Sequence, residues 1–253
     1  MSRPRPDTTL IVIPSRMAST RLPGKPLADI AGEAMIVQVW RRARDSGAGT
    51  VLVAAAEEEI AAAVRAAGGE AVLTDPNLLS GTDRVAQAVG LRDPQRRFGF
   101  IVNLQGDLPT LDPAAIAACL APLADPHIDI ATLASEIRDP AEALNRNVVK
   151  AIADFAPDRP VAVATDFRRD IDSAEGGPYW HHIGIYAFRR TALERFVLLE
   201  PSAREKSRRL EQMRALDAGM TIAVARVDSA PFGVDTPADL ERARATLVAA
   251  SIR

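Results

Sequence analysis

The sequence predicts an α/β fold with a mainly parallel, Rossmann-like sheet and a smaller mixed-sheet insertion. Short runs of branched apolar residues, typical of strands buried on both faces, alternate with segments of helical periodicity. Strands that alternate in this way with helices of about 10–15 residues imply βαβ units. The 253 residues, of which 47% are hydrophobic and 25% charged, suffice for one α/β body with a sizeable core.

The first half of the chain carries the clearest βαβ pattern. Strands are predicted at Leu10–Ile13, Val51–Ala54, Ala71–Leu73 and Phe98–Leu104. Helices are predicted at Met35–Ser46, Glu57–Ala67, Thr82–Val89 and from Pro113 to about Leu123. Gly68 and Gly69 stop the second helix, and Pro113 opens the fourth because proline suits the first helical turn.

The second half is richer in strands. These are predicted at Ile128–Ile137, Val148–Ala153, Val161–Ala164, His182–Phe188 and Thr221–Val227. Helices are predicted at Leu193–Leu199, Arg204–Ala218 and from Pro237 to about Ala250. With no internal repeat and no long linker, we expect a single domain over 1–253 with a flexible tail at 1–9, and the mixed-sheet insertion falls at roughly 128–220.

Composition excludes several classes of protein. A net charge of −2 argues against nucleic-acid binding, which usually requires a basic surplus. No apolar run approaches the roughly 20 residues of a membrane span, so no membrane insertion is expected. The N-terminus lacks the apolar core of a signal peptide, and the lone Cys119 rules out an internal disulfide. We therefore expect a cytoplasmic protein.

The loop after the first strand carries three cations, Arg16, Arg21 and Lys25, and no acidic residue. Prolines and a glycine around Lys25 favour a fixed loop. Cations on a loop that leaves the carboxyl end of a buried strand suit a polyphosphate, although a solvated basic loop has the same composition. The spacing matches neither the Walker-type phosphate loop nor the Rossmann glycine fingerprint.

Two aspartates are candidate magnesium ligands. Asp107 follows a buried strand through a Gln-Gly turn, which places it on the same edge of the sheet as the basic loop. A carboxylate beside bound phosphates requires a cation between them, and Mg²⁺ is usually held by one or two carboxylates plus phosphates. Asp235 is the natural second ligand. The structural alternatives are a turn aspartate for Asp107 and a helix start for Asp235.

Two further polar groups are weaker signals. In Ser80-Gly81-Thr82-Asp83-Arg84, Gly81 lets backbone amides approach a base or phosphate, while Thr82 or Asp83 alternatively caps the next helix. His182 and Tyr186 share one face of a strand. With Glu211 and Gln212 opposite, they form either a pocket for a hydroxylated acid or locally satisfied side chains.

Six segments together resemble the 3-deoxy-manno-octulosonate cytidylyltransferase (CMP-Kdo synthetase) family. They occur in the family's order and run from the first strand to the last helix. The segments are Ile13-Pro-Ser-Arg-Met-Ala-Ser-Thr-Arg-Leu-Pro-Gly-Lys-Pro-Leu, Ser80-Gly-Thr-Asp-Arg, Val102-Asn-Leu-Gln-Gly-Asp, His182-Ile-Gly-Ile-Tyr, Leu210-Glu-Gln-Met-Arg and Gly233-Val-Asp-Thr-Pro-Ala-Asp-Leu-Glu.

The resemblance implies the nucleotide-diphospho-sugar transferase fold, Mg²⁺ dependence and a homodimer. It also implies transfer of CMP from CTP to Kdo, with release of pyrophosphate, for lipopolysaccharide biosynthesis. By position, the catalytic residues would be Arg16, Lys25, Asp107 and Asp235, with both aspartates on Mg²⁺. The nucleotide would be bound by Arg16, Arg21, Lys25, Ser80, Gly81, Thr82 and Arg84. The sugar pocket and dimer contact would fall within roughly 128–220, and the pocket would be lined by Gln105, His182, Tyr186, Glu211 and Gln212.

Three departures from the family pattern keep rival functions open. Ala54-Ala55-Ala56 stands where the family has Ala-Thr-Asp, so a carboxylate is missing, and Leu108 replaces a glutamate. The family's Tyr-Phe-Ser-Arg segment should fall within 163–170, which here contains Asp166 and Asp170. These charges would repel an anionic sugar. We therefore expect the segment to turn away from the sugar or to be disordered, with Arg168 or Arg169 in its place; failing that, the pocket would accept a substrate with a compensating amine.

The rivals are a cytidylyltransferase for another sugar acid, such as an amino-Kdo or a nonulosonic acid, and a non-catalytic nucleotide-binding paralogue. Retention of Asp107 and Asp235 argues against the second rival, because a protein without catalysis needs no metal carboxylates.

Overall fold

The computed structural model describes residues 3–171 and 178–251. It divides into two compact units. The terminal unit comprises 5–116 together with the C-terminal segment from 231 onward. The central unit comprises the described part of 117–230 with the residues just before Arg5. The stretch that the sequence assigns to an insertion, roughly 128–220, falls inside the central unit, whereas the expectation of a single domain stays a prediction.

Four parallel strands form the sheet of the terminal unit, in the order β5-β4-β1-β6. Their bounds are Thr9–Ser15 for β1, Thr50–Ala55 for β4, Glu70–Leu73 for β5 and Phe100–Asn103 for β6. Leu10, Ile11, Val12 and Ile13 are fully buried, as expected for a strand covered on both faces. The predicted α/β class is therefore confirmed for this unit.

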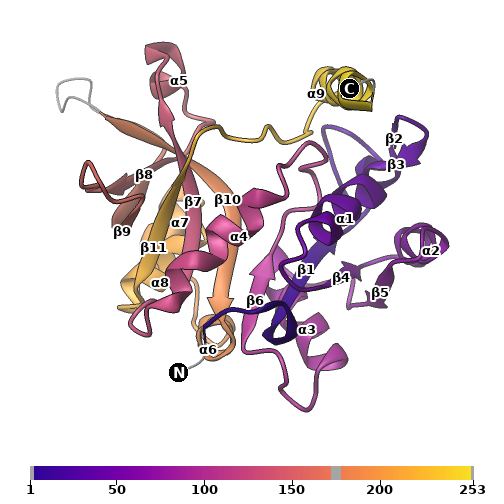
Figure 1. The fold of residues 1–253 in the computed structure, drawn as a ribbon, viewed down its shortest axis with the longest axis horizontal. Helices are drawn as coiled ribbons and strands as arrows, with labels where there is room; N and C mark the ends of the chain where they lie inside the picture. Colours follow the sequence, from indigo (N-terminus) through magenta and orange to yellow (C-terminus); the bar gives the residue numbers. More distant parts are fainter. Residues whose placement is uncertain (1–2, 172–177, 252–253) are drawn as a thin grey trace. The chain divides into compact units, whose positions relative to one another are not determined.

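Helices of the terminal unit surround these strands (Figure 1). They are α1 (Met35–Asp45), α2 (Glu58–Ala66), α3 (Gly81–Arg92) and α9 (Pro237–Ser251), with the 3-10 turn η2 at Lys25–Leu27. A short hairpin of β2 (Asp29–Ile30) and β3 (Glu33–Ala34) precedes α1 and was not predicted, because two-residue strands leave no periodicity to detect. The buried cluster of Ile30, Met35, Val234, Leu240, Ala243 and Leu247 fixes α9 against this hairpin.

The predicted tail at 1–9 is too long. Pro6–Thr8 form a 3-10 turn (η1), and Thr9 is the first, fully buried residue of β1. The Thr9 hydroxyl donates to the Arg5 carbonyl at 2.8 Å, which orders the chain from Arg5 onward. Met1 and Ser2 lie outside the described residues.

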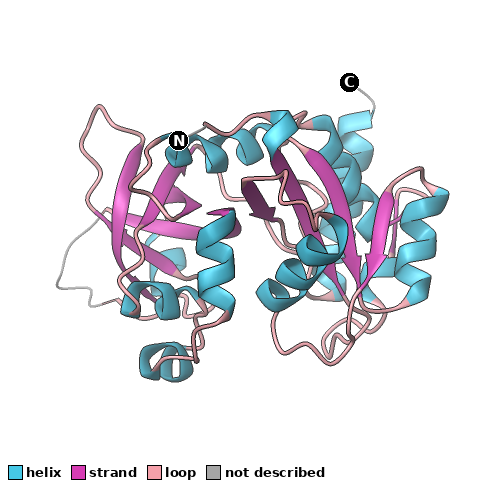
Figure 2. Ribbon diagram, turned by 90° about the horizontal axis from the view of Figure 1, so that it is seen from below, coloured by secondary structure: helices cyan, strands magenta, loops and turns pink. Residues whose placement is uncertain are grey.

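The central unit holds a mixed sheet of β10-β7-β11-β9-β8 (Figure 2). Its strands are β7 (Ile130–Ile137), β8 (Lys150–Ala153), β9 (Val161–Arg168), β10 (Tyr179–Arg189) and β11 (Ile222–Val227). β7 and β11 are parallel, and the other pairs within the unit are antiparallel. Because β8 also pairs with β10, the five strands close on themselves.

The helices of this part of the chain are short. They are α5 (Pro140–Leu144), α6 (Arg190–Val197), α7 (Ala203–Arg208) and α8 (Gln212–Asp217); α4 (Ala114–Leu120) and the 3-10 turn η3 (Ala121–Ala124) come before β7. The single helix predicted over Arg204–Ala218 is wrong. Arg209 has a left-handed backbone (φ 55°) and ends α7, while Leu210 turns into the core with 5% exposure. Glu211 and Gln212 therefore lie at the start of α8.

We predict that Asp93→Ala lowers the free energy of unfolding by about 3 kcal/mol. Asp93 is fully buried, and its carboxylate accepts from the backbone N–H groups of Arg97 (3.0 Å) and Phe98 (2.9 Å). Its loss removes the acceptor of the buried Phe98 N–H and of the Arg97 N–H, just before β6. Urea denaturation followed by circular dichroism measures the change. Asp93→Asn keeps one carbonyl oxygen and should lose about half as much, whereas an alanine variant as stable as the wild type would contradict this account.

Candidate active site

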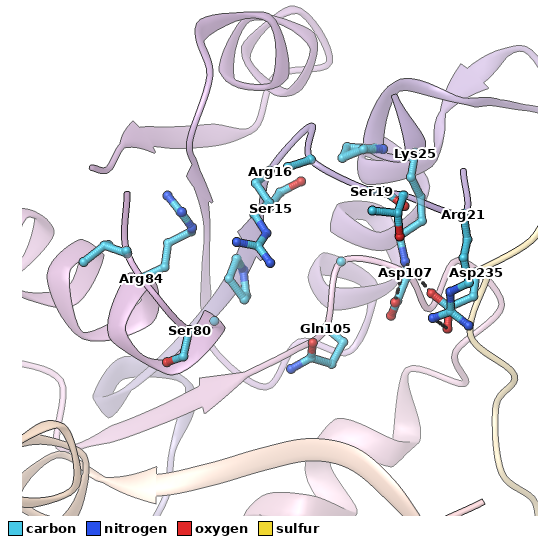
Figure 3. Close-up of a pocket in the computed structure, with 17 residues that line it drawn as sticks. Ser15, Arg16, Ser19, Arg21, Lys25, Ser80, Arg84, Gln105, Asp107 and Asp235 are labelled. Carbon is cyan, nitrogen blue, oxygen red and sulfur yellow. Dashed lines mark hydrogen bonds and ion pairs between the residues drawn. The ribbon is translucent and has the colours of Figure 1, made fainter. Parts of the chain in front are cut away.

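A pocket of about 440 Å³ opens at the carboxyl end of β1, entirely within the terminal unit. Four segments of the chain line it: the loop after β1, the start of α3, the turn after β6 and the segment before α9. Figure 3 shows Arg84 and Ser80 on one side, Asp107 and Asp235 on the other, and Arg16 between them. The structure thus brings the following predicted residues to one cavity: Arg16, Arg21, Lys25, Ser80, Gly81, Arg84, Gln105, Asp107 and Asp235.

Lys25 lies between the two aspartates. Its ammonium Nζ is 2.8 Å from Asp107 Oδ2 and 3.0 Å from Asp235 Oδ1, and Arg21 Nη2 is 2.9 Å from Asp235 Oδ2. Burial alone would lower the pKa of Lys25, but the two carboxylates outweigh it and raise the pKa above its usual value. The lysine is therefore charged, and together with Arg21 it balances the two carboxylates.

Local backbone geometry places these three side chains. Gly24 adopts a left-handed conformation (φ 68°), after which Lys25 opens the 3-10 turn η2. Gly106 is needed for a close approach, because a Cβ there would lie 3.0 Å from the Pro14 carbonyl oxygen. The Val234 N–H donates to the Asp107 carbonyl at 2.9 Å, which ties the segment of Asp235 to that of Asp107.

The helix-start alternative for Asp235 does not hold, because Thr236 takes that role. Thr236 Oγ1 accepts from the Asp239 N–H at 3.2 Å, and Asp239 Oδ2 accepts from the Thr236 N–H at 2.9 Å. This reciprocal pair caps α9. The carboxylate of Asp235 is left to Lys25 and Arg21.

The donor set fits a divalent cation that is completed by a substrate. Within 3–171 and 178–251, no group of three or more histidine, cysteine, aspartate or glutamate side chains could hold a metal ion. Two carboxylates in one pocket match the way Mg²⁺ is usually bound, with substrate phosphates and water as the remaining ligands. Asp107 and Asp235 already hold a cation, the ammonium of Lys25, which shows that they converge on one position.

Arg84 presents an unused donor to the pocket. The residue is 2% exposed, and its Nη1 donates to Thr74 Oγ1 and to the Asp75 carbonyl at 2.5 and 3.1 Å. Its Nη2 is buried and has no hydrogen-bond partner within the described chain. Burial lowers the pKa of Arg84, partly offset by Glu57. A buried guanidinium donor of this kind is satisfied by a water molecule or by an acceptor from a ligand.

Ser80 and Thr82 have structural contacts at the start of α3. Ser80 is the N-cap residue, and its hydroxyl accepts from the Asp83 N–H at 3.1 Å. Thr82 does not line the pocket: it is 3% exposed, and its hydroxyl accepts from Asn103 Nδ2 at 3.4 Å. Because Ser80 is the N-cap, α3 begins at Gly81 and Thr82 is its second residue. The Thr82 side chain faces Asn103 of β6 and not the pocket.

Glu57 was missed in the sequence analysis. It lies two residues after the end of β4, and its Oε2 accepts from the backbone N–H of Met17, in the loop after β1, at 2.9 Å. The signal was present, because a carboxylate just beyond a parallel strand reaches the same edge as the β1 loop.

Three of the predicted sugar-pocket residues meet in the central unit. The rings of His182 and Tyr186 are 5.4 Å apart, and the charge of Glu211 adds to burial in raising the pKa of Tyr186. Burial lowers the pKa of His182 to about 3, so the ring is neutral at physiological pH. Gln212 follows Glu211 and is 7% exposed, and its Nε2 has no partner among the residues described. Gln105 belongs to the terminal unit.

The His182 ring has a defined tautomer. The Thr132 hydroxyl lies 3.1 Å from His182 Nε2 and donates to backbone carbonyl oxygens of Ile183 or Ile185 at 3.0 and 2.8 Å. Since a hydroxyl has only one proton to donate, we assign the His182 proton to Nε2, which donates to Thr132. Nδ1 is then the acceptor atom of the ring.

The altered segment 163–170 turns its acidic side chain away from His182. Phe167 packs its ring on His182 at 5.0 Å, and alternation along β9 places Asp166 on the opposite face. Asp166 binds Arg168 at 2.8 Å and Arg208 at 2.5 Å. Burial would raise the pKa of Asp166, but these arginines outweigh it and lower the pKa.

The neighbours of Asp166 and Phe167 are also paired locally. Arg169 donates to the carbonyls of Arg208 and Arg209 at 3.3 and 3.4 Å, next to the break between α7 and α8. Asp170 pairs with Arg146 at 2.8 Å. The charges that made this segment seem incompatible with an anionic sugar are therefore neutralised within the central unit.

Comparisons with known proteins agree with this geometry. Residues 10–222 match the cytidylyltransferase family. The chain is 60% identical to the 3-deoxy-manno-octulosonate cytidylyltransferase of Parvibaculum lavamentivorans, over 96% of this chain and 94% of the relative. It is 57% identical to that of Paramagnetospirillum magneticum, over 96% and 98%.

A solved structure has the same fold. It is a CMP:2-keto-3-deoxy-manno-octonic acid synthetase complexed with CTP, 37% identical to this chain, with a TM-score of 0.86 over 95% of this chain and 98% of that one. Identity at this level over nearly the whole length, together with the pocket described above, establishes the family. The chain belongs to the 3-deoxy-manno-octulosonate cytidylyltransferase family.

Proposed function

We propose that the protein transfers CMP from CTP to 3-deoxy-manno-octulosonate (Kdo), giving CMP-Kdo and pyrophosphate for lipopolysaccharide biosynthesis. The observation that carries the proposal is one pocket that combines the cations Arg16, Arg21 and Lys25 with two carboxylates. The chain is also 60% identical to a 3-deoxy-manno-octulosonate cytidylyltransferase. The anomeric hydroxyl of the sugar attacks the α-phosphorus and loses its proton. As the new O–P bond forms, the bond to pyrophosphate breaks.

Positioning and charge neutralisation account for this reaction without a covalent nucleophile. Phosphoryl-type transfer spreads negative charge over the reacting phosphate and the leaving group. Fixed cations stabilise that charge most effectively in a partly buried site. Lys25 suits this role, because its side chain is only 16% exposed and its neighbours keep it charged. Arg16 and Arg21 are exposed and meet the outer phosphates.

We further propose that Mg²⁺ binds Asp107 and Asp235 when the nucleotide is present. The ion supplies a second source of positive charge for the triphosphate. In the structure Lys25 pairs with both carboxylates, and Arg21 pairs with Asp235 as well. If the ammonium turns to the phosphates, Asp107 loses its counter-charge and Asp235 keeps only Arg21. A divalent cation replaces the lost charge, so metal and nucleotide are expected to bind together.

Arg84 supports recognition of cytosine. Its buried Nη2 requires an acceptor, and the Watson–Crick edge of cytosine offers two, O2 and N3. Uracil carries an N–H at N3, which would oppose a guanidinium donor. Gly81 lines the same part of the pocket and leaves room there, since a Cβ at that position would meet only the Pro14 ring at 3.7 Å.

The sugar pocket is proposed from the central unit. A neutral His182, the phenol of Tyr186 and the unpartnered Nε2 of Gln212 offer hydrogen bonds to a polyhydroxylated acid. Glu211 beside Tyr186 accepts from sugar hydroxyls rather than from an anionic group. Gln105, on the turn before Asp107, lines the pocket of the terminal unit, and its contact with the sugar stays a prediction.

A homodimer and a cytoplasmic location stay predictions. The side chains of Val161 (36% exposed) and Val163 (51% exposed) lie on the same side of β9. These exposed apolar side chains support the dimer, because a second subunit could cover them. Sedimentation equilibrium would decide it. No helix among the described residues is long and apolar enough to cross a membrane.

The central test is pyrophosphate release from CTP with a panel of sugar acids. We expect turnover with Kdo, because the acidic groups of segment 163–170 are neutralised by arginines. Turnover only with an amino-Kdo or a nonulosonic acid would move the substrate to that acid. Binding of CTP without turnover of any acid would contradict an enzymatic role.

We predict that Lys25→Ala lowers kcat by about a hundredfold or more, because it removes a charge that counters the separating phosphates. The KM for the sugar acid should change much less. Steady-state kinetics on the folded variant separate the two constants. An unchanged kcat would remove the β1 loop from the mechanism. In the absence of CTP, the same variant should bind Mn²⁺ more tightly than the wild type in a calorimetric titration, since Lys25 no longer occupies Asp107 and Asp235.

We predict that Asp107→Asn and Asp235→Asn each abolish Mg²⁺-dependent activity while the fold is retained. An amide keeps the shape of the carboxylate but lacks the negative charge that a hard divalent cation requires. Activity is measured over a range of Mg²⁺ concentrations, with circular dichroism as the control for folding. Asp112→Asn serves as a matched control, because Asp112 lies outside the pocket and binds the Ala114 N–H. Full activity of either variant at ordinary Mg²⁺ concentrations would exclude the metal role.

A further inference from the structure

We propose that Glu57 is a positioning residue that holds Arg16 in place at the start of the phosphate-binding loop. This inference rests on the proposed function. It gives a role to a carboxylate at the active edge of the sheet, where Ala54–Ala56 provide none. Glu57 does not line the pocket, so its effect on a bound nucleotide must pass through the loop.

Two hydrogen bonds from consecutive residues bracket Arg16. The N–H of Ala56 donates to the carbonyl of Ser15 at 2.9 Å, which extends the β1–β4 ladder by one bond. The carboxylate of Glu57 then accepts from the N–H of Met17, also at 2.9 Å. The residues before and after Arg16 are thus both fixed to the start of α2. This restricts the backbone from which the Arg16 side chain extends into the pocket.

Glu57 binds the loop instead of its own helix. It is the N-cap residue of α2, yet its side chain makes no capping hydrogen bond. A serine or aspartate at this position would be short enough to cap the helix. The longer glutamate side chain reaches a backbone N–H that is 40 residues earlier in the sequence. Helix α2 therefore lacks a side-chain cap, and the Glu57 carboxylate holds the loop after β1 instead.

Glu57 has two opposite effects on phosphate binding. Its hydrogen bond to the loop favours binding, whereas its negative charge opposes it. The carboxylate lies close enough to Arg84 to raise the pKa of that guanidinium, whereas Arg16 lowers it. Glu57 therefore offsets the effect that the positive charge of Arg16 has on Arg84. The same negative charge would repel a triphosphate. Anchoring and charge thus have opposite effects on CTP affinity, and two substitutions separate them.

The test compares Glu57→Ala with Glu57→Gln. Glutamine keeps an oxygen that can accept from the Met17 N–H and loses only the charge, whereas alanine loses both. We expect alanine to weaken CTP binding by about tenfold, corresponding to one lost anchoring hydrogen bond. Glutamine should bind CTP at least as tightly as the wild type. The KM for the sugar acid should stay unchanged in both variants. Isothermal titration calorimetry and steady-state kinetics measure these quantities.

Two controls make the outcome decisive. Glu59→Ala removes an exposed carboxylate from the same helix and should leave CTP affinity unchanged. Amide hydrogen exchange at Met17, measured by NMR in the folded protein, should accelerate in Glu57→Ala and stay slow in Glu57→Gln. Equal CTP affinity of the alanine and glutamine variants, or unchanged exchange at Met17, would overturn the anchoring role.

Arg16→Ala separates this inference from the proposed function. If Arg16→Ala weakens CTP binding and Glu57→Ala does not, only the positioning role fails. If neither substitution affects CTP binding, the β1 loop does not bind the phosphates, and the proposed function of the pocket fails as well.

Discussion

The ammonium of Lys25 between the carboxylates of Asp107 and Asp235 is the interaction on which the site depends. Two carboxylates this close would repel each other without a cation, so the lysine makes their convergence possible in the free protein. The same two groups are suited to a metal ion, and the same lysine is suited to phosphates. The pocket therefore contains mutually neutralising charges that a nucleotide with its metal can rearrange. Because the groups are already in place, binding needs little reorganisation of the backbone.

Apolar packing and a close backbone approach beside the pocket hold these charges together. The apolar side chains of Val234 and Leu240 bury the segment around Asp235 against the β2–β3 hairpin, next to the loop of Lys25. The absence of a side chain at Gly106 lets the turn of Asp107 approach the backbone of β1. The positions of the charged groups are thus set by uncharged contacts, which are insensitive to salt and to the ligand.

The central unit shows how an altered segment is accommodated. Asp166 is enclosed by Arg168 and Arg208, while Phe167 presents an apolar ring to His182. The alternation of side chains along β9 separates the two environments by a single residue. Acidic residues in the segment therefore need not change the side chain that contacts His182. This is why Asp166 does not argue against an anionic sugar substrate.

The sequence by itself determined the α/β class, the four parallel strands and the helices around them in the terminal unit, and the residue types of the site. These follow from local periodicity, and from polar residues at the ends of buried strands, which meet at one edge of a parallel sheet. The break at Arg209 was not predictable, because the burial of Leu210 overrides a continuous helical pattern.

Tertiary structure alone decided which charges pair. Lys25 meets Asp107 and Asp235 across 82 and 210 residues, and Glu57 meets Met17 across 40. Contacts over such separations depend on how whole elements pack, and local periodicity carries no information about that packing.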